Sequence, residues 1–161
     1  AVQARDRGLT QPLHRADANL QMAADFPENY ERFPDAFQFI KDVALDWEKS
    51  VYLEAEPGYF LTIARKAKGT GQWFVGNVNG FEGRTGAVKL DFLDAGKLYV
   101  AELYTDQPTA HFKTNPQAYQ ISTWLVDSKS VLRQYSAPGG GYAIRIREVS
   151  KEEAKGIKKL K

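Results

Sequence analysis

The spacing of apolar residues along the chain changes once, near Asp46. From Leu9 to Val43 apolar residues recur at steps of three and four, the period of a helix with one buried face. After Asp46 the period becomes two, which is typical of strands with one buried face, and it is clearest over residues 88–92 and 142–147. The pattern predicts a short helical segment followed by an all-β region.

Eight strands are predicted in that region, separated by turns rich in glycine, proline and aspartate. The predicted strands cover residues 50–55, 59–66, 72–77, 87–93, 97–105, 117–126, 130–135 and 142–148. Many short strands without intervening helices favour a mainly β fold, an antiparallel β-sandwich of Greek-key type.

The helical segment contains two signals for the start of a helix. Asp25 is placed to cap a helix that opens at Pro27, and Pro34 marks a second start. In the second helix Phe37, Ile40 and Val43 fall on one face, which we expect to pack against the strands.

Three segments follow from these patterns: a helical lead-in over 1–45, a β-sandwich over 46–149 and a basic tail over 150–161. The tail is rich in lysine and has few apolar residues, so we expect a frayed end, with a partner-binding helix as the alternative.

Composition bounds the function without specifying it. A chain of 161 residues with 43% hydrophobic and 26% charged residues matches one ordinary soluble domain. The net charge of +2 argues for neither a nucleic-acid nor a membrane partner, and the absence of cysteine excludes disulfides and thiolate chemistry. Residues 1–19 lack the pattern of a signal peptide, and the start at Ala1 indicates a processed or truncated product.

Few residues form a pattern that indicates catalysis. His14 and His111 stand apart from any nucleophile motif, and a metal site built on them would need carboxylates from distant segments. Glu54 and Glu56 share one strand face and have a spacing that a glycosidase pair allows, but solvated carboxylates are ordinary beside a turn. The glycines at 139–141 precede a strand, so we interpret them as a turn with positive φ angles and not as a phosphate loop.

Aromatic residues are the more informative resource, because sugars stack on flat exposed rings. Trp47, Trp73 and Trp124 are candidate carbohydrate-stacking residues. Each lies in or beside a predicted strand, where core packing is the commoner role.

Several short motifs, in order, resemble glycoside hydrolase family 97 near its C-terminus. They lie between Leu20 and Ile146, most of the chain: residues 20–30 (LQMAADFPENY), 37–43 (FQFIKDV), 46–48 (DWE), 54–58 (EAEPG), 63–66 (IARK), 73–76 (WFVG), 90–93 (LDFL) and 137–141 (APGGG).

The resemblance implies a parent enzyme with an N-terminal β-sandwich, a catalytic (β/α)8 barrel with a calcium ion, and this C-terminal sandwich. Members hydrolyse α-glucosides or α-galactosides, with inversion or retention, and are secreted, typically periplasmic bacterial enzymes. Residues 13–19 depart from the family because they lack the apolar run of a barrel strand. The family's catalytic and calcium-binding residues lie upstream, so no catalytic, metal or cofactor role transfers to this chain. Gln21 and Asp25 would flank the active-site end of the last barrel strand in a full-length parent.

Three functional hypotheses follow. The first is a noncatalytic accessory domain that supports the barrel and associates with further copies of itself, since the resembled domain is linked to oligomerisation. The second is a carbohydrate-binding module that uses exposed aromatics. The third, a glycosidase active by itself, is the one we do not expect.

Overall fold

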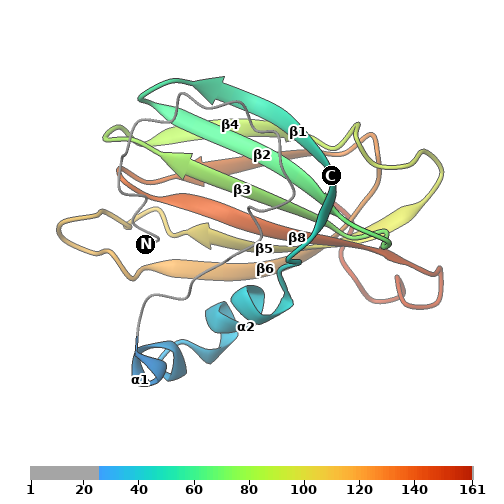
Figure 1. Ribbon diagram of the computed structural model, residues 1–161, viewed down its shortest axis with the longest axis horizontal. Helices are drawn as coiled ribbons and strands as arrows, with labels where there is room; N and C mark the ends of the chain where they lie inside the picture. The colour runs from blue at the N-terminus through green and yellow to red at the C-terminus, as the bar shows by residue number, and fades with distance from the viewer. Residues whose placement is uncertain (1–25, 161) are drawn as a thin grey trace.

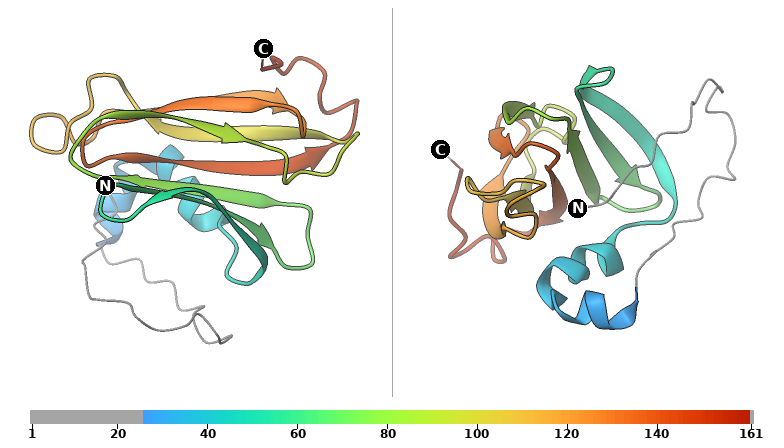
Figure 2. Two further views of the ribbon diagram at one scale, coloured as in Figure 1. Left: turned by 90° about the horizontal axis from the view of Figure 1, so that it is seen from above. Right: turned by 90° about the vertical axis from the view of Figure 1, so that its left-hand side faces the viewer.

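Two antiparallel sheets pack face to face, and two short helices lie on the outside of the larger sheet (Figures 1 and 2). The computed structural model describes residues 26–160. The helices are α1 (Pro27–Glu31) and α2 (Pro34–Asp42). The strands are β1 (Trp47–Glu56), β2 (Phe60–Ala67), β3 (Trp73–Asn79), β4 (Arg84–Lys89), β5 (Leu98–Asp106), β6 (Tyr119–Val126), β7 (Val131–Ser136) and β8 (Gly141–Val149). The larger sheet has the order β1-β2-β3-β8-β5-β6, and the smaller sheet consists of β4 and β7.

This arrangement confirms the predicted mainly β fold of eight antiparallel strands with helices before them. The predicted bounds of the strands are shifted by up to four residues, and the largest difference is in β4, which runs from Arg84 to Lys89 and not from residue 87 to residue 93. Lys89 pairs with Val131, the first residue of β7, and Leu90 makes one further backbone hydrogen bond, to the Ser130 carbonyl, before the chain turns. Leu90 is nevertheless fully buried, and its carbonyl accepts a hydrogen bond from Leu93 in a turn. The alternation of apolar residues at 88–92 therefore predicted the burial of Val88 and Leu90 correctly, but it predicted too late an end for the strand.

The core lies between the two sheets and follows the period of two. Alternate residues of the central strands, such as Ile144 and Ile146 of β8 and Ala101 and Leu103 of β5, are at most 1% exposed. A buried polar chain also crosses between the sheets. Ser136 donates to Asn77 at 2.7 Å, and the Asn77 amide donates to Thr62 at 2.9 Å.

Helix α2 packs on the outer face of the larger sheet through a different face from the one predicted. Phe39 and Val43 point toward the sheet, whereas Ile40 is 43% exposed and Phe37 stacks on Tyr30 of α1. The prediction of Phe37 and Ile40 at the sheet was wrong, while Val43 was placed correctly. The expected cap residue Asp25 lies outside the described residues; the N-cap position of α1 is Phe26, and α2 starts at Pro34 as expected.

The C-terminal segment is not frayed over residues 150–160. Leu125 of β6 donates to the Lys158 carbonyl and accepts from Leu160, at 2.9 and 3.0 Å. Leu160 also packs against the core, and Lys158 lies over the Trp124 ring. The segment thus pairs with the C-terminal end of β6, at the edge of the larger sheet.

Candidate functional site: the outer face of the six-stranded sheet

One half of the outer sheet face is covered by α2, and the contacts that hold the helix are mixed in character. Phe39 packs edge-on against Phe74 of β3 and Tyr104 of β5, with ring centroids 6.0 and 5.2 Å apart. Asp42 pairs with Arg145 of β8 at 2.7 Å. The helix is therefore fixed by both apolar and charged contacts.

Polar contacts continue along the same stripe of α2. Tyr119, at the start of β6, donates to the Asp35 carboxylate at 2.7 Å. This hydrogen bond holds the pKa of Asp35 below its ordinary value and raises the pKa of Tyr119. Because residues 35, 39, 42 and 43 follow helical spacing, one stripe meets four strands of the sheet.

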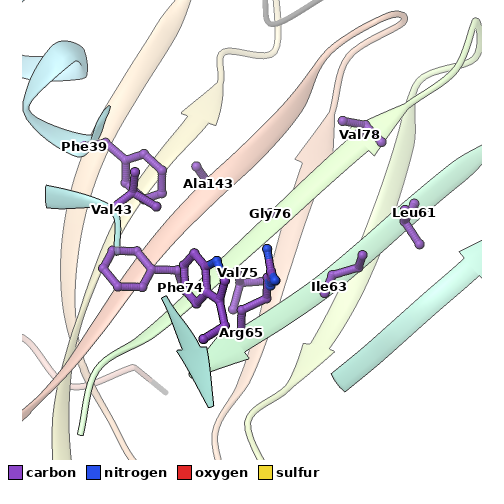
Figure 3. Close-up of a pocket in the computed structure, with 11 residues that line it drawn as sticks. Phe39, Val43, Leu61, Ile63, Arg65, Phe74, Val75, Gly76, Val78 and Ala143 are labelled. Carbon is purple, nitrogen blue, oxygen red and sulfur yellow. The ribbon is translucent and has the colours of Figure 1, made fainter. Parts of the chain in front are cut away.

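The other half of the outer face, over β1 to β3, carries an apolar hollow of about 310 Å³ (Figure 3). Its floor is formed by Leu61 and Ile63 of β2 and by Phe74 and Val78 of β3. Phe39 and Val43 close the end nearest α2. The hollow is thus a continuation of the seam between α2 and the sheet.

Arg65 is the charged residue in this lining. Its guanidinium lies 4.5 Å from the centre of the Trp47 ring, and its Nε donates to Ser50 at 3.2 Å. Partial burial lowers the pKa of Arg65. Because the Arg65 guanidinium already contacts the Trp47 ring and the Ser50 hydroxyl, it is not directed at a ligand in the hollow. The hollow is therefore suited to apolar groups and not to an anion.

The three tryptophans occupy different environments. Trp73 is 5% exposed and packs in the core against Phe92. Trp47 lines the hollow and contacts Phe74 as well as Arg65, and Trp124 packs partly against the core below Lys158. Burial assigns Trp73 to packing; sugar stacking on Trp47 or Trp124 stays a prediction, with a cation already over each ring.

The carboxylates Glu54 and Glu56 differ in their surroundings: Glu54 is bound by Arg84, whereas Glu56 is exposed at the end of β1. Both Glu54 oxygens accept hydrogen bonds from Arg84, at 2.9 and 3.0 Å. The Arg84 guanidinium holds the pKa of Glu54 below its ordinary value, which keeps this carboxylate ionised. Arg84 also lies 3.7 Å from the centre of the Phe60 ring, so the pair joins β4 to the edge of the larger sheet.

The remaining predicted features lie at the far end of the sandwich, in the loops. His111 accepts a hydrogen bond from the Lys113 amide and stacks on Phe112, as part of an exposed loop. Gly139 has φ +68°, which confirms the predicted turn. The carboxylate of Asp106 accepts the N–H groups of Ala137 and Gly141, at 2.9 and 2.8 Å, so the turn binds an internal anion. Sequence reasoning missed Asp106, because nothing local links it to a turn 31 residues away.

His14 and Gln21, like Asp25, lie outside the described residues. Over residues 26–160 no group of three or more His, Cys, Asp or Glu side chains could hold a metal ion. Within the same range no helix is long and apolar enough to cross a membrane.

The fold and this outer face define a compact β-sandwich domain with an attached helical entry segment. Residues 46–147 match the family model described as the C-terminal, oligomerisation domain of glycosyl hydrolase 97. The chain belongs to this family.

Individual relatives agree with that assignment. The chain is 30% identical over 131 residues to a retaining α-galactosidase of Bacteroides thetaiotaomicron, covering 81% of this chain and 19% of the relative. It is 41% identical to a glycoside hydrolase family 97 enzyme of Pseudoalteromonas sp. in complex with acarbose, with a TM-score of 0.79 over 81% of this chain and 20% of that one. A variant of that enzyme in complex with panose matches with the same TM-score, identity and coverage. The chain spans about a fifth of the length of these relatives.

Proposed function

We propose that this chain acts as a noncatalytic assembly domain, which joins copies of an α-glycoside hydrolase through self-association. The proposal rests on the match of residues 46–147 to a family model whose description names oligomerisation. The apolar hollow on the outer sheet face supports it, because large exposed apolar surfaces commonly mark interaction sites.

Self-association is tested by sedimentation velocity and light scattering of the isolated chain across a wide concentration series. We expect a mass that rises from monomer toward dimer or a higher assembly. A monomeric mass at every concentration would reject the proposal. In parallel, nitrophenyl α-glucosides and α-galactosides should not be hydrolysed, and turnover by the purified chain would show that it is more than an accessory domain.

The complete protein, we further propose, hydrolyses α-glucosides or α-galactosides in a preceding catalytic barrel and is secreted or periplasmic. The names of the relatives support this substrate class. A calcium ion would belong to that barrel; residues 26–160 do not supply a ligand cluster for it. Activity of the full-length protein on both substrate classes, with metal analysis and cell fractionation, tests these points.

A further inference from the structure

The carboxyl end of β3 contains the one Asn–Gly pair of the sequence, Asn79–Gly80. It lies beside the turn of residues 137–140 that leads into β8, at the end of the sandwich on the left of Figure 1. An asparagine followed by glycine is chemically labile, because glycine has no side chain that would hinder attack of its backbone nitrogen on the asparagine side chain. The pair is therefore a candidate site of covalent modification.

The Asn79 side chain joins two separate segments of the chain. Its amide nitrogen lies 2.6 Å from the Glu82 carbonyl oxygen and 3.0 Å from that of Ala137, and the Ser136 carbonyl oxygen is 3.4 Å away. Because a carboxamide has two hydrogens to donate, this side chain holds the β3–β4 connection against the end of β7. Aspartate has a similar shape, but its carboxylate has no hydrogen to donate to these carbonyls.

The fold also requires the glycine. A Cβ atom at position 80 would lie 2.9 Å from the Tyr59 carbonyl oxygen, which is too close for two nonbonded atoms. The Gly80 amide donates to this same carbonyl at 2.7 Å, and the Gly80 carbonyl accepts from the Gly139 amide at 2.6 Å. Packing therefore keeps at position 80 the residue that makes its neighbour labile.

The same hydrogen bonds protect Asn79 while the chain is folded. The Gly80 nitrogen, which must attack, donates its hydrogen to Tyr59, and the carboxamide that must be attacked is bound to Glu82 and Ala137. Both groups have to release these partners before they can meet. Local opening of this end of the sandwich therefore precedes the reaction.

We propose that Asn79 is a site of spontaneous deamidation whose rate is controlled by this local opening. The Gly80 nitrogen bonds to the side-chain carbonyl carbon of Asn79, and its proton goes to the side-chain amide nitrogen, which leaves as ammonia. Water then opens the cyclic imide at either of its two carbonyl carbons and leaves aspartate or isoaspartate at position 79. The reaction needs water alone, and the inference is independent of self-association.

The product cannot restore the original contacts. An ionised carboxylate only accepts hydrogen bonds, so it would face the carbonyl oxygens of Glu82 and Ala137 without a hydrogen between them. Isoaspartate also adds a methylene group to the main chain, which would displace Gly80 from Tyr59. Each conversion should therefore leave residues 80–83 and 137–140 more open, and the change is irreversible.

The first experiment follows Asn79 by peptide mapping with mass spectrometry in the whole 161-residue chain, kept at mildly alkaline pH in buffer or in guanidinium chloride. Conversion should be at least about tenfold faster in the denaturant, because a protected site reacts only through its open state. Asn77, which is followed by valine, is the internal control and should convert far more slowly in the unfolded chain. Equal rates at Asn79 in the two solutions would reject control by opening, and equal rates at Asn79 and Asn77 in the denaturant would reject the site.

A pair of glycine variants tests which opening controls the rate in the folded chain. Gly139→Ala places a side chain at φ +68°, against Phe112, in the turn that is bonded to Gly80, and should speed conversion severalfold. Gly96→Ala introduces the same kind of strain at φ +81° in the turn before β5 and should change the rate by less than about twofold. Equal acceleration by both variants would contradict a local opening at the 137–140 turn.

Asn79→Asp tests the consequence without the reaction, and it serves also if Gly139→Ala does not fold. Hydrogen exchange should become faster in residues 80–84 and 137–141 and stay unchanged in the core of β8. Asn29→Asp makes the same change at an exposed position of α1 and should leave exchange in both segments as it is. Unchanged exchange in Asn79→Asp would show that the carboxamide does not hold these segments together.

Discussion

The inner and outer faces of the six-stranded sheet are closed in different ways. The inner face is covered mainly by an apolar core, with Ile144 and Leu103 at most 1% exposed, and by the buried polar chain of Ser136, Asn77 and Thr62. Helix α2 covers the outer face over β5, β6 and β8. It is held there by the Asp42–Arg145 ion pair, by the hydrogen bond from Tyr119 to Asp35, and by the contact between the Phe39 and Tyr104 rings. Over β1, β2 and the part of β3 beyond Phe74, residues 26–160 leave an apolar hollow on this face. Folding stability should therefore depend on the inner face and docking on the outer one.

The largest effect is expected in the core. Ile144→Ala removes a fully buried side chain from the central strand β8 and should lower the free energy of unfolding by about 3–4 kcal/mol. Urea denaturation followed by circular dichroism measures this loss. The matched change on the outer face, Val78→Ala, should cost well under about 1 kcal/mol, and equal losses at the two sites would remove the proposed difference between the faces.

A smaller loss is expected where α2 meets the sheet. Phe39→Ala removes the ring that contacts both Phe74 and Tyr104 and should cost about 2 kcal/mol, because this side chain is only partly buried. Hydrogen exchange should rise in residues 34–42 more than in β8. Phe37→Ala, which loses a stacking contact with Tyr30 within the helical segment, is the control and should leave the sheet contacts intact.

The Glu54–Arg84 pair should make stability depend on pH. The hydrogen bonds from Arg84 lower the folded-state pKa of Glu54, so their stabilisation is fully present above the ordinary glutamate pKa of about 4.3 and is lost as pH falls through the lower folded value. Glu54→Gln should cost about 1 kcal/mol at neutral pH for this partly buried pair.

The pH profile provides the check on that prediction. The difference in unfolding free energy between wild type and Glu54→Gln should shrink as the solution is acidified. A difference that stays constant from neutral to strongly acidic pH would show that ionisation of Glu54 does not supply it.

The smallest effect is expected at the helix position that sequence spacing placed toward the sheet. Ile40→Gln should change the free energy of unfolding by less than about 0.5 kcal/mol, because the side chain is 43% exposed. A loss as large as that of Phe39→Ala would contradict the exposed position of Ile40. Thermal unfolding of both variants in one buffer is sufficient.

The strands could be predicted because packing between two sheets buries every second residue of a strand. The apolar residues Tyr142, Ile144 and Ile146 show this alternation in the sequence. The orientation of α2 was not, because the sheet face beneath it carries Arg145 and Tyr119, and its docking stripe therefore contains Asp35 and Asp42 beside Phe39. The spacing of apolar residues alone does not identify the docking side of a helix when half of the contacting residues are polar.

Long-range polar partners were equally hidden from the sequence. Glu54 meets Arg84 across 30 residues, and Asp106 meets the 137–141 turn across 31 or more. No local signal specifies such pairs. The prediction of a frayed tail was wrong for a related reason, since a lysine-rich composition gives no sign of the partly buried Leu160 and its backbone hydrogen bond to β6.

The place where Asp42 meets Arg145 has a mechanical consequence. Arg145 belongs to β8, which lies inside the larger sheet between β3 and β5. A pull on the chain ahead of Pro27 would reach the domain through α2, and part of the load would pass to this interior strand before the edge strand β1 is peeled away. Because the Asp42–Arg145 contact is not covalent, it would give way first, and only then would the load reach the covalently connected edge strand β1, which opens one bond at a time.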